Sequence, residues 1–345
     1  MHQPIAIIGA GSSGLAAAHT LRDAGYPVTI FELSSSVGGR ATTRQLNGFT
    51  YDHGAQYIKQ GSPASVSLIT NRFRLPDLLD IAKPVWTFDS AGTIREGDPV
   101  QNAEPKWTYR GGLISLFQHM ATGLDVRLRT SVASLHQQGS IWHLLDQHGQ
   151  PLGSYQRVLI TAPAPQALTL IQASRLDDTL HQAIHTHLSA AQYNPLISIM
   201  LGYRPAPSPR PYYALVNTDR QHPISWLAWE HEKAPERVPP GSGLLLAQMA
   251  PGFSRQHDHS PDSLLYQEAA NLVTTLLNEA LPEPCFQDIQ RWPYALPATR
   301  ADANALNTLT MPTGLAFCGD SFVGGRVHLS LEHGIDVART LIATT

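Results

Sequence analysis

The spacing of apolar residues predicts a strand–helix–strand unit at the start of the chain. Ile5–Ile8 is an uninterrupted apolar run, which is typical of a strand buried on both faces of a parallel sheet. Residues 16–24 have the composition of a helix, and Gly25 follows where a C-terminal glycine cap is expected. Val28–Phe31 is a second apolar run. We therefore predict a βαβ unit within about 30 residues.

The apolar pattern after residue 31 predicts that the C-terminal end of the chain belongs to the same domain as the βαβ unit. Tyr203–Trp229, rich in proline and aromatic residues, suits a sheet with irregular connections between these regions. Both ends of the chain thus contribute to one nucleotide-binding domain, with a second domain inserted. The apolar runs predict strands at 124–128, 131–135, 141–145, 157–160 and 315–318, and helical spacing predicts helices over 263–279 and 329–342.

Composition then narrows the class of protein. The length of 345 residues suggests about two domains, and 42% hydrophobic residues supply a sizeable core. A formal net charge of −3 argues against a nucleic-acid partner, which requires a basic face. Cys285 and Cys318 lie far apart outside any CxxC pattern, so we expect no disulfide framework and a cytoplasmic location. The 16 histidines are scattered without a ligand frame, so no metal site is predicted.

Membrane and export signals are also not expected. The chain contains no run of about 20 apolar residues, the length that a membrane span requires. The apolar start at Ile5 has no basic segment before it, so we expect no signal peptide.

A glycine-rich turn between the first strand and the first helix carries the clearest chemistry. Gly9, Gly11 and Gly14 form a GxGxxG pattern. The first glycine permits a tight turn, the second lets a pyrophosphate approach the backbone, and the third lets helix and strand pack closely. Ser12 and Ser13 lie in the same turn, just before the helix, whose N-terminal N–H groups and dipole favour an anion. The pattern in this context predicts dinucleotide binding.

The residues that follow distinguish FAD from NAD. Glu32 ends the second strand, where a carboxylate accepts the hydroxyls of an adenosine ribose. Gly38, Gly39 and Arg40 then form a second glycine turn that folds back over the pyrophosphate and brings a guanidinium to it. A plain NAD dehydrogenase has no need of this second turn. We therefore predict FAD as the tightly held dinucleotide.

At this point the chain resembles the FAD-dependent amine oxidase superfamily, in which the βαβ unit is followed by such a GGR turn. Residues 52–57, DHGAQY, resemble the D-x-G-A-Q-Y segment of its renalase-like branch, which includes bacterial members. Residues 318–320, CGD, followed by GGRV at 324–327 and a helix, resemble the second flavin motif of the family. The resemblance extends over nearly the whole chain and is most specific at the two flavin motifs.

The resemblance implies further cofactor contacts. Gly319 and Asp320 meet the ribityl chain, and the helix start at Arg326 and Val327 faces the pyrimidine end of the isoalloxazine, where a helix dipole stabilises the anionic reduced flavin. Val132, expected in the strand 131–135, presents its backbone to the adenine. Neither cysteine stands where covalently flavinylated relatives carry one, so the FAD is expected to be non-covalent. The loop residues implied to contact the flavin are Gly54, Ala55 and Gln56.

The fold class that follows is α/β: a Rossmann-type FAD-binding domain with an inserted α+β substrate domain, an architecture like that of p-hydroxybenzoate hydroxylase and the amine oxidases. We assign residues 1–75, 107–165 and 290–345 to the FAD-binding domain. Residues 76–106 and 166–289 form the substrate-binding domain. No oligomeric state is predicted.

The resemblance also implies a reaction. The flavin N5 takes a hydride from a small-molecule substrate, an isomeric dihydronicotinamide dinucleotide (2- or 6-dihydro-NAD(P)), and O2 reoxidises the flavin to give hydrogen peroxide. The alternatives are a flavin oxidase of small or aromatic amines, and a flavin-bound carrier or scaffold without activity. No side-chain acid or base is expected, and none of the four lysines can be placed at N5 from sequence. The candidate pocket residues are Gln56, Tyr57, Trp226, Trp292 and Tyr294.

Overall fold

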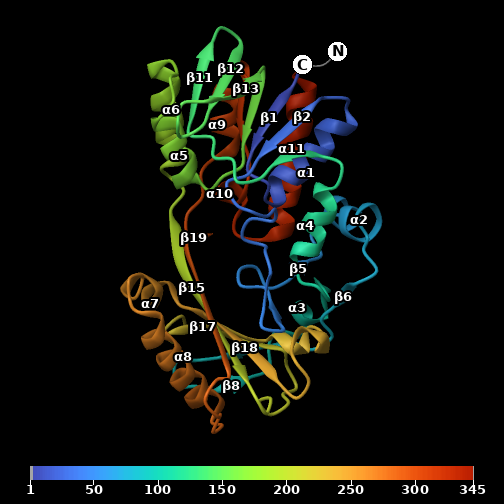
Figure 1. The fold of residues 1–345 in the computed structure, drawn as a ribbon, viewed down its shortest axis with the longest axis vertical. Helices are drawn as coiled ribbons and strands as arrows, with labels where there is room; N and C mark the ends of the chain where they lie inside the picture. The colour runs from blue at the N-terminus through green and yellow to red at the C-terminus, as the bar shows by residue number, and fades with distance from the viewer. Residues whose placement is uncertain (1–2, 345) are drawn as a thin grey trace.

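A five-stranded parallel sheet is the centre of the first half of the molecule (Figure 1). The computed structural model describes residues 3–344. The strand order is β10-β2-β1-β14-β20, so segments from the start, middle and end of the chain share one sheet. The strands are β1 (Ile5–Ile8), β2 (Val28–Phe31), β10 (Asp125–Arg127), β14 (Arg157–Ile160) and β20 (Leu315–Phe317).

Both faces of this sheet are buried, because alternate residues of β1 enter two different cores. Ile5 and Ile7 pack with the first set of helices, and Ala6 and Ile8 with the second. The first set consists of α1 (Ser12–Asp23), α4 (Ile114–Ala121) and α11 (Val327–Ala343). The second set consists of α5 (Ala164–Gln172), α6 (Asp178–Leu188) and α9 (Ala303–Thr310).

A small antiparallel sheet of three strands packs against the second core through Leu135, Trp142 and Tyr155. The predicted strand 131–135 is displaced, because pairing begins only at Ser134. A third strand was not predicted, since a proline and a glycine within it weaken a strand pattern. The strands are β11 (Ser134–Gln138), β12 (Ile141–Leu145) and β13 (Pro151–Tyr155).

A seven-stranded sheet forms the second half of the molecule, in the order β19-β15-β18-β17-β16-β7-β8. Helices α7 (Pro251–Gln256) and α8 (Asp262–Leu277) lie at one side of it, and α8 buries Leu265, Ala269 and Val273 against the strands. The strands are β7 (Val85–Phe88), β8 (Ile94–Arg95), β15 (Tyr193–Tyr203), β16 (Ala214–Asn217), β17 (Ile224–Trp229), β18 (Gly243–Met249) and β19 (Phe286–Pro297).

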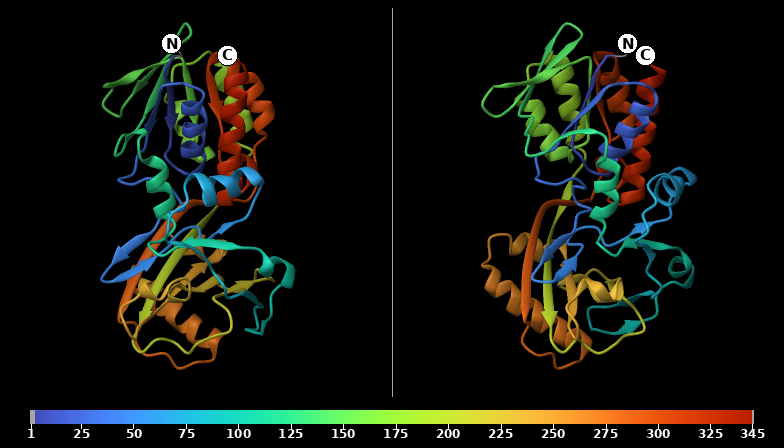
Figure 2. Two further views of the ribbon diagram at one scale, coloured as in Figure 1. Left: turned by 90° about the vertical axis from the view of Figure 1, so that its right-hand side faces the viewer. Right: turned by 45° about the vertical axis from the view of Figure 1, so that its right-hand side comes forward.

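Several segments of the chain run between the halves, as Figure 2 shows. The long antiparallel pair β15 and β19 runs from one half to the other, and the β3–β4 hairpin packs Phe49 and Tyr51 against Met200 and Leu244 of the large sheet. The remaining strands and α-helices are β3 (Arg44–Leu46), β4 (Phe49–Tyr51), β5 (Ile58–Lys59), β6 (Leu78–Asp80), β9 (Lys106–Tyr109), α2 (Pro63–Ser67), α3 (Pro99–Ala103) and α10 (Asp320–Val323).

The predicted α/β class with a Rossmann-type domain is confirmed by this arrangement. The exact domain boundaries stay a prediction. The boundary expected at residue 290 falls inside β19, and α5 and α6, expected in the substrate domain, pack on the five-stranded sheet. Within residues 3–344, no helix is both long and apolar enough to span a bilayer.

Candidate cofactor and substrate site

A cavity of about 800 Å³ lies between the two large sheets. It is lined by the turn after β1, the end of β2, the loop 54–57, the start of α11 and side chains from β15, β17, β18 and β19. All the cofactor residues predicted from sequence line it except Gly14 and Gly319, and so do all five pocket candidates. The predicted residues that line it are Gly9, Gly11, Ser12, Ser13, Glu32, Gly39, Arg40, Gly54, Ala55, Gln56, Tyr57, Val132, Trp226, Trp292, Tyr294, Asp320, Arg326 and Val327.

The three glycines of the first turn are required for different reasons. Gly9 has a φ of +112°, which only glycine adopts readily. A Cβ on Gly14 would lie 2.0 Å from the Gly9 carbonyl oxygen, so Gly14 permits the close contact of α1 with the turn and stays outside the cavity. A Cβ on Gly11 would meet no atom within 4 Å. The open space at Gly11 is where a pyrophosphate can approach the backbone.

Glu32 is held rigidly at the end of β2. Its two carboxylate oxygens each accept a backbone hydrogen bond of 2.8 Å, Oε2 from Ala10 N and Oε1 from Ser34 N. The side chain is buried yet lines the cavity. Each oxygen retains a lone pair for a hydroxyl group, as the ribose role requires.

Arg40 contacts the second flavin motif. Its Nη2 lies 2.7 Å from Asp320 Oδ1, and its Nη1 donates to the carbonyl oxygens of Tyr294 and Ala295. Asp320 also accepts a hydrogen bond of 2.9 Å from Tyr193. Although burial opposes it, the Asp320 carboxylate helps to raise the pKa of Arg40, which stays charged. The predicted motifs around residues 40 and 320 therefore meet in one charged pair.

The loop 52–57 passes very close to Arg40. A Cβ on Gly54 would lie 2.0 Å from the Arg40 carbonyl oxygen, and Ala55 N donates to the same oxygen at 2.9 Å. Trp292 Nε1 donates to the His53 carbonyl at 2.9 Å, and the two rings stack with centroids 5.4 Å apart. The loop is thus fixed from both halves of the molecule.

Aromatic side chains surround the end of the cavity next to the large sheet. Tyr57 lies beside Trp226, with ring centroids 6.3 Å apart, and Trp292 and Tyr294 come from β19. Burial raises the pKa of the Tyr57 phenol, which is therefore neutral near pH 7. Sequence reasoning missed several lining residues here, among them Leu196 on β15 and Gln248 on β18. In the sequence, both residues fit the apolar or alternating pattern of an ordinary strand, and nothing in that pattern indicates a role in a site.

The charged residues of the cavity wall are few. Among the described residues that line it, they are Glu32, Arg40, Asp320 and Arg326. No lysine, histidine or cysteine of the 3–344 range lines it. Burial raises the pKa of the Cys318 thiol, so this cysteine is an unreactive core residue, as predicted.

The remaining predicted contacts come from the segment before β11 and from the start of α11. Val132 lines the cavity from the segment just before β11, so the expectation that Val132 belongs to a strand is wrong: β11 begins at Ser134, and only Ala133 N already donates to the Leu145 carbonyl of β12. Arg326 caps the N-terminus of α11, and Val327 is its first residue. The positive end of this 17-residue helix therefore faces the cavity.

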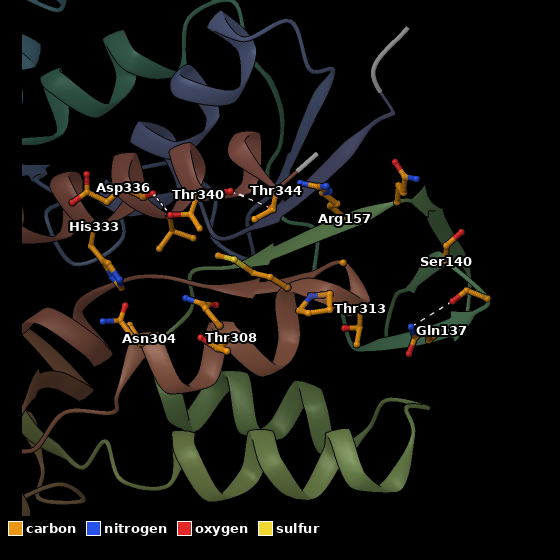
Figure 3. Close-up of a pocket in the computed structure, with 18 residues that line it drawn as sticks. Gln137, Ser140, Arg157, Asn304, Thr308, Thr313, His333, Asp336, Thr340 and Thr344 are labelled. Atoms are coloured by element: carbon orange, nitrogen blue, oxygen red, sulfur yellow. Dashed lines mark hydrogen bonds between the residues drawn. The ribbon is translucent and has the colours of Figure 1, made fainter.

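A second hollow of about 1050 Å³ lies between α9, α11 and the edge of β14 (Figure 3). Polar side chains such as Asn304, Thr308, Asp336 and Thr340 line it. None of the predicted cofactor residues does. Among residues 3–344, no group of three or more histidine, cysteine, aspartate or glutamate side chains is arranged to hold a metal ion.

Comparison with protein families agrees with the geometry of the first cavity. Residues 7–70 match the model of the NAD(P)-binding Rossmann-like domain. Residues 93–342, more than half of the chain, match the model of the flavin containing amine oxidoreductases.

Curated relatives match over short segments only. The chain is 42% identical over 65 residues to protoporphyrinogen oxidase 2, chloroplastic/mitochondrial, of Arabidopsis thaliana, which covers 19% of this chain and 13% of that protein. It is 36% identical over 85 residues to a 4,4'-diapophytoene desaturase of Staphylococcus haemolyticus, which covers 25% of this chain and 17% of that protein. The chain thus matches less than a fifth of the length of either relative.

Solved structures share the fold over the whole chain. A putative protoporphyrinogen oxidase from Exiguobacterium sp. 255-15 has a TM-score of 0.80 at 16% identity, covering 100% of both chains. A reduced UDP-galactopyranose mutase has a TM-score of 0.81 at 14% identity, covering 100% of this chain and 96% of that one. A putrescine oxidase bound to putrescine has a TM-score of 0.73 at 16% identity, covering 99% of both. At these identities the likeness concerns the fold alone.

Proposed function

Because the chain belongs to the family of flavin containing amine oxidoreductases, we propose that it oxidises an isomeric dihydronicotinamide dinucleotide, 2- or 6-dihydro-NAD(P), to NAD(P)⁺. At the level of the family, the predictions of a flavoprotein, an oxidoreductase and FAD as cofactor are confirmed. The substrate, O2 as the oxidant and the renalase-like branch are the finer proposal, which rests on residues 52–57 and on the cavity. A cytoplasmic location is part of the same proposal.

The residues of the cavity suit FAD. The turn at Gly9–Gly14 and the start of α1 would hold the pyrophosphate, since the space at Gly11 is open. Glu32 would accept the adenosine ribose hydroxyls, and Val132 would contact the adenine. Asp320 would meet the ribityl chain, and the N-terminus of α11 the pyrimidine edge. When bound, the flavin accepts a hydride at N5 and returns the two electrons to O2.

One observation carries the choice of substrate: among residues 3–344, the cavity wall offers no lysine or imidazole, and both of its carboxylates are already engaged, Glu32 by backbone N–H groups and Asp320 by Arg40. A dihydronicotinamide needs none of these, because its ring nitrogen lone pair drives hydride loss without a general base. Amine sites of this superfamily often use a lysine that holds a water at N5. Here Lys59, Lys83, Lys106 and Lys233 all lie outside the cavity wall.

The chain's own residues would then act by binding and orientation. The rings of Tyr57, Trp226 and Trp292 give a flat, largely apolar site for a nicotinamide ring. Their placement selects which ring carbon faces N5, and misplacement by about 1 Å can cost on the order of 100-fold in rate. With one proton from water, the hydride and O2 yield one hydrogen peroxide for each NAD(P)⁺.

Oxidation of an amine is the second candidate, because the same aromatic rings favour a cation. Anaerobic stopped-flow mixing distinguishes the candidates by the loss of flavin absorbance at about 450 nm. We expect 2- or 6-dihydro-NAD(P) to bleach the flavin orders of magnitude faster than NADH or a panel of amines. Fastest bleaching by an amine would move the assignment to amine oxidase, and by ordinary NADH to a general NADH oxidase. A flavin that none of these reduces would indicate a carrier.

A further inference from the structure

Four charged side chains, one of them from the loop 52–57, are buried together. Asp52, Glu230, Lys233 and Arg237 all have side chains with 0% exposure. Lys233 Nζ lies 3.2 Å from Asp52 Oδ2 and 2.6 Å from Glu230 Oε1, and Arg237 Nη1 lies 2.7 Å from a carboxylate oxygen of each. We call these four residues the charged quartet. Its two carboxylates and two cations balance.

The charged quartet joins the two halves of the molecule. Glu230, Lys233 and Arg237 follow β17, whereas Asp52 follows β4. Asp52 Oδ1 accepts from Thr43 Oγ1 at 2.6 Å and from a backbone N–H, and Arg237 Nη2 donates to a backbone carbonyl and a threonine of β9. Apolar side chains in place of a buried ion cluster are often neutral or stabilising. Stability alone therefore does not account for the quartet, and its remaining contact is informative.

That contact is a hydrogen bond from Lys233 to the wall of the cavity. Lys233 Nζ lies 3.2 Å from Gln56 Oε1. Gln56 Nε2 in turn donates to the carbonyl oxygens of Asp52 at 2.5 Å and Gly54 at 3.1 Å. Both N–H groups of the amide are thus used within the loop, and its oxygen faces the ammonium group. Gln56 lines the cavity and Lys233 does not.

The Gln56 amide is therefore the connection between a buried charge and a flavin-facing loop. The Gly54 carbonyl accepts a further hydrogen bond of 2.7 Å from Gln248 on the substrate side. If the amide loses its ammonium partner, no other residue of the described chain donates to its oxygen, and the amide can rotate away from the loop carbonyls. The loop then relaxes on the side that faces the cavity.

We propose that Lys233 is a positioning residue for the bound flavin, which it affects through the Gln56 amide and the loop 52–57. The inference rests on the proposed placement of FAD in this cavity. Groups around the isoalloxazine tune its electronics, so a displaced loop changes the flavin reduction potential. Arg237 provides a matched control, since it has the same burial and the same two carboxylate partners but donates to β9 instead of Gln56.

The test compares two charge-balanced variants, E230Q/K233M and E230Q/R237M, each alone and combined with Q56L. The readout is the midpoint potential of bound FAD, measured by photoreduction against a reference dye without any substrate. We expect E230Q/K233M and Q56L each to change the equilibrium constant for flavin reduction about tenfold, which is about 30 mV for two electrons. When Q56L is added to E230Q/K233M, the equilibrium constant for flavin reduction changes by less than about twofold further, because the effects of coupled residues are not additive.

The control sets the opposite expectation. E230Q/R237M leaves the equilibrium constant within about twofold of the parent, and Q56L adds its full effect there. Additive effects of E230Q/K233M and Q56L, or equal shifts in the two charge-balanced variants, would overturn the proposal.

If the variants with methionine or leucine side chains do not retain FAD, two milder variants still decide the test. K233R and R237K preserve both charges of the quartet, and only K233R replaces the single-point contact with Gln56 by a guanidinium fork. A shifted potential in K233R and a parent-like potential in R237K support the proposal. Equal potentials in K233R and the parent contradict it. If Lys233 and Gln56 show the expected coupling but dihydronicotinamides do not reduce the flavin, the proposed substrate is wrong and the role of Lys233 still stands.

Discussion

At the scale of single residues, Glu32 is the side chain whose role is most directly testable. Its carboxylate is held by Ala10 N and Ser34 N, so it is positioned before any ligand arrives. Charge-assisted hydrogen bonds contribute about 1.5–3 kcal/mol each, so Glu32→Ala should weaken FAD binding by about tenfold or more. Titration of the apoprotein with FAD measures this, and Glu32→Gln, which keeps one acceptor, should fall between. Equal affinity in all three would show that Glu32 does not contact the ribose.

His53 makes stability depend on pH. Burial lowers the pKa of His53 to about 4, with Arg44 contributing, and its Nδ1 has no hydrogen-bond partner within residues 3–344. The unfolded chain takes up this proton at about pH 6.5, so the stability from neutral His53 is present above that value and lost as the pH falls toward 4.

The matched variant is His53→Phe, which retains a ring against Trp292. Between pH 7 and pH 4, the free energy of unfolding of the parent should fall by about 3 kcal/mol more than that of the variant. Urea unfolding at the two pH values gives the difference. Parallel losses in parent and variant would mean that His53 titrates normally in the folded state.

At the scale of elements, two glycines of the GxGxxG pattern after β1 are expected to have different roles, Gly14 in stability and Gly11 in FAD binding. Gly14→Ala places a Cβ 2.0 Å from the Gly9 carbonyl oxygen, so we expect thermal unfolding of the apoprotein at a clearly lower temperature. Gly11→Ala meets no atom, so its apoprotein should unfold as the parent does, while its FAD affinity falls because the backbone approach is blocked. A Gly11→Ala chain that binds FAD normally would place the pyrophosphate elsewhere.

The elements that sequence predicted best are those whose pattern is local. β1, β2, β14 and α8 have uninterrupted or periodic apolar residues, and the structure places them within one or two residues of the prediction. β13 was not predicted, because Pro151 and Gly153 are unusual within strands. This strand is stabilised by its pairing with β12. The helix predicted over 16–24 begins four residues earlier, at Ser12, since small residues there conceal its first turn.

At the scale of the whole molecule, the site is assembled from segments that are distant in sequence. Glycine turns and Glu32 have strong local signals, and so the cofactor end of the cavity was predictable. Leu196, Gln248 and the charged quartet were not. Residues 230–237 include five charged side chains, the usual composition of an exposed surface, and only the fold shows that three of them are buried.

Removal of the cofactor tests the non-covalent claim. Cys285 and Cys318 both lie outside the cavity wall, so acid or heat should release FAD into the supernatant. Returning FAD to the apoprotein at about 1,000 times its Kd should raise the free energy of unfolding by about 4 kcal/mol. Absorbance of the supernatant and thermal unfolding with and without FAD check both points. Flavin fluorescence that stays with the denatured chain on a gel would contradict the claim.

A single turnover without oxygen tests the proposed oxidation of a dihydronicotinamide most directly. Oxidised protein is mixed with one equivalent of 2- or 6-dihydro-NAD(P), and flavin bleaching and NAD(P)⁺ are both quantified. We expect one NAD(P)⁺ for each flavin reduced, followed by one hydrogen peroxide when O2 is admitted. Bleaching without NAD(P)⁺, or a flavin that stays oxidised with both isomers but is reduced by an amine, would contradict the proposed oxidation.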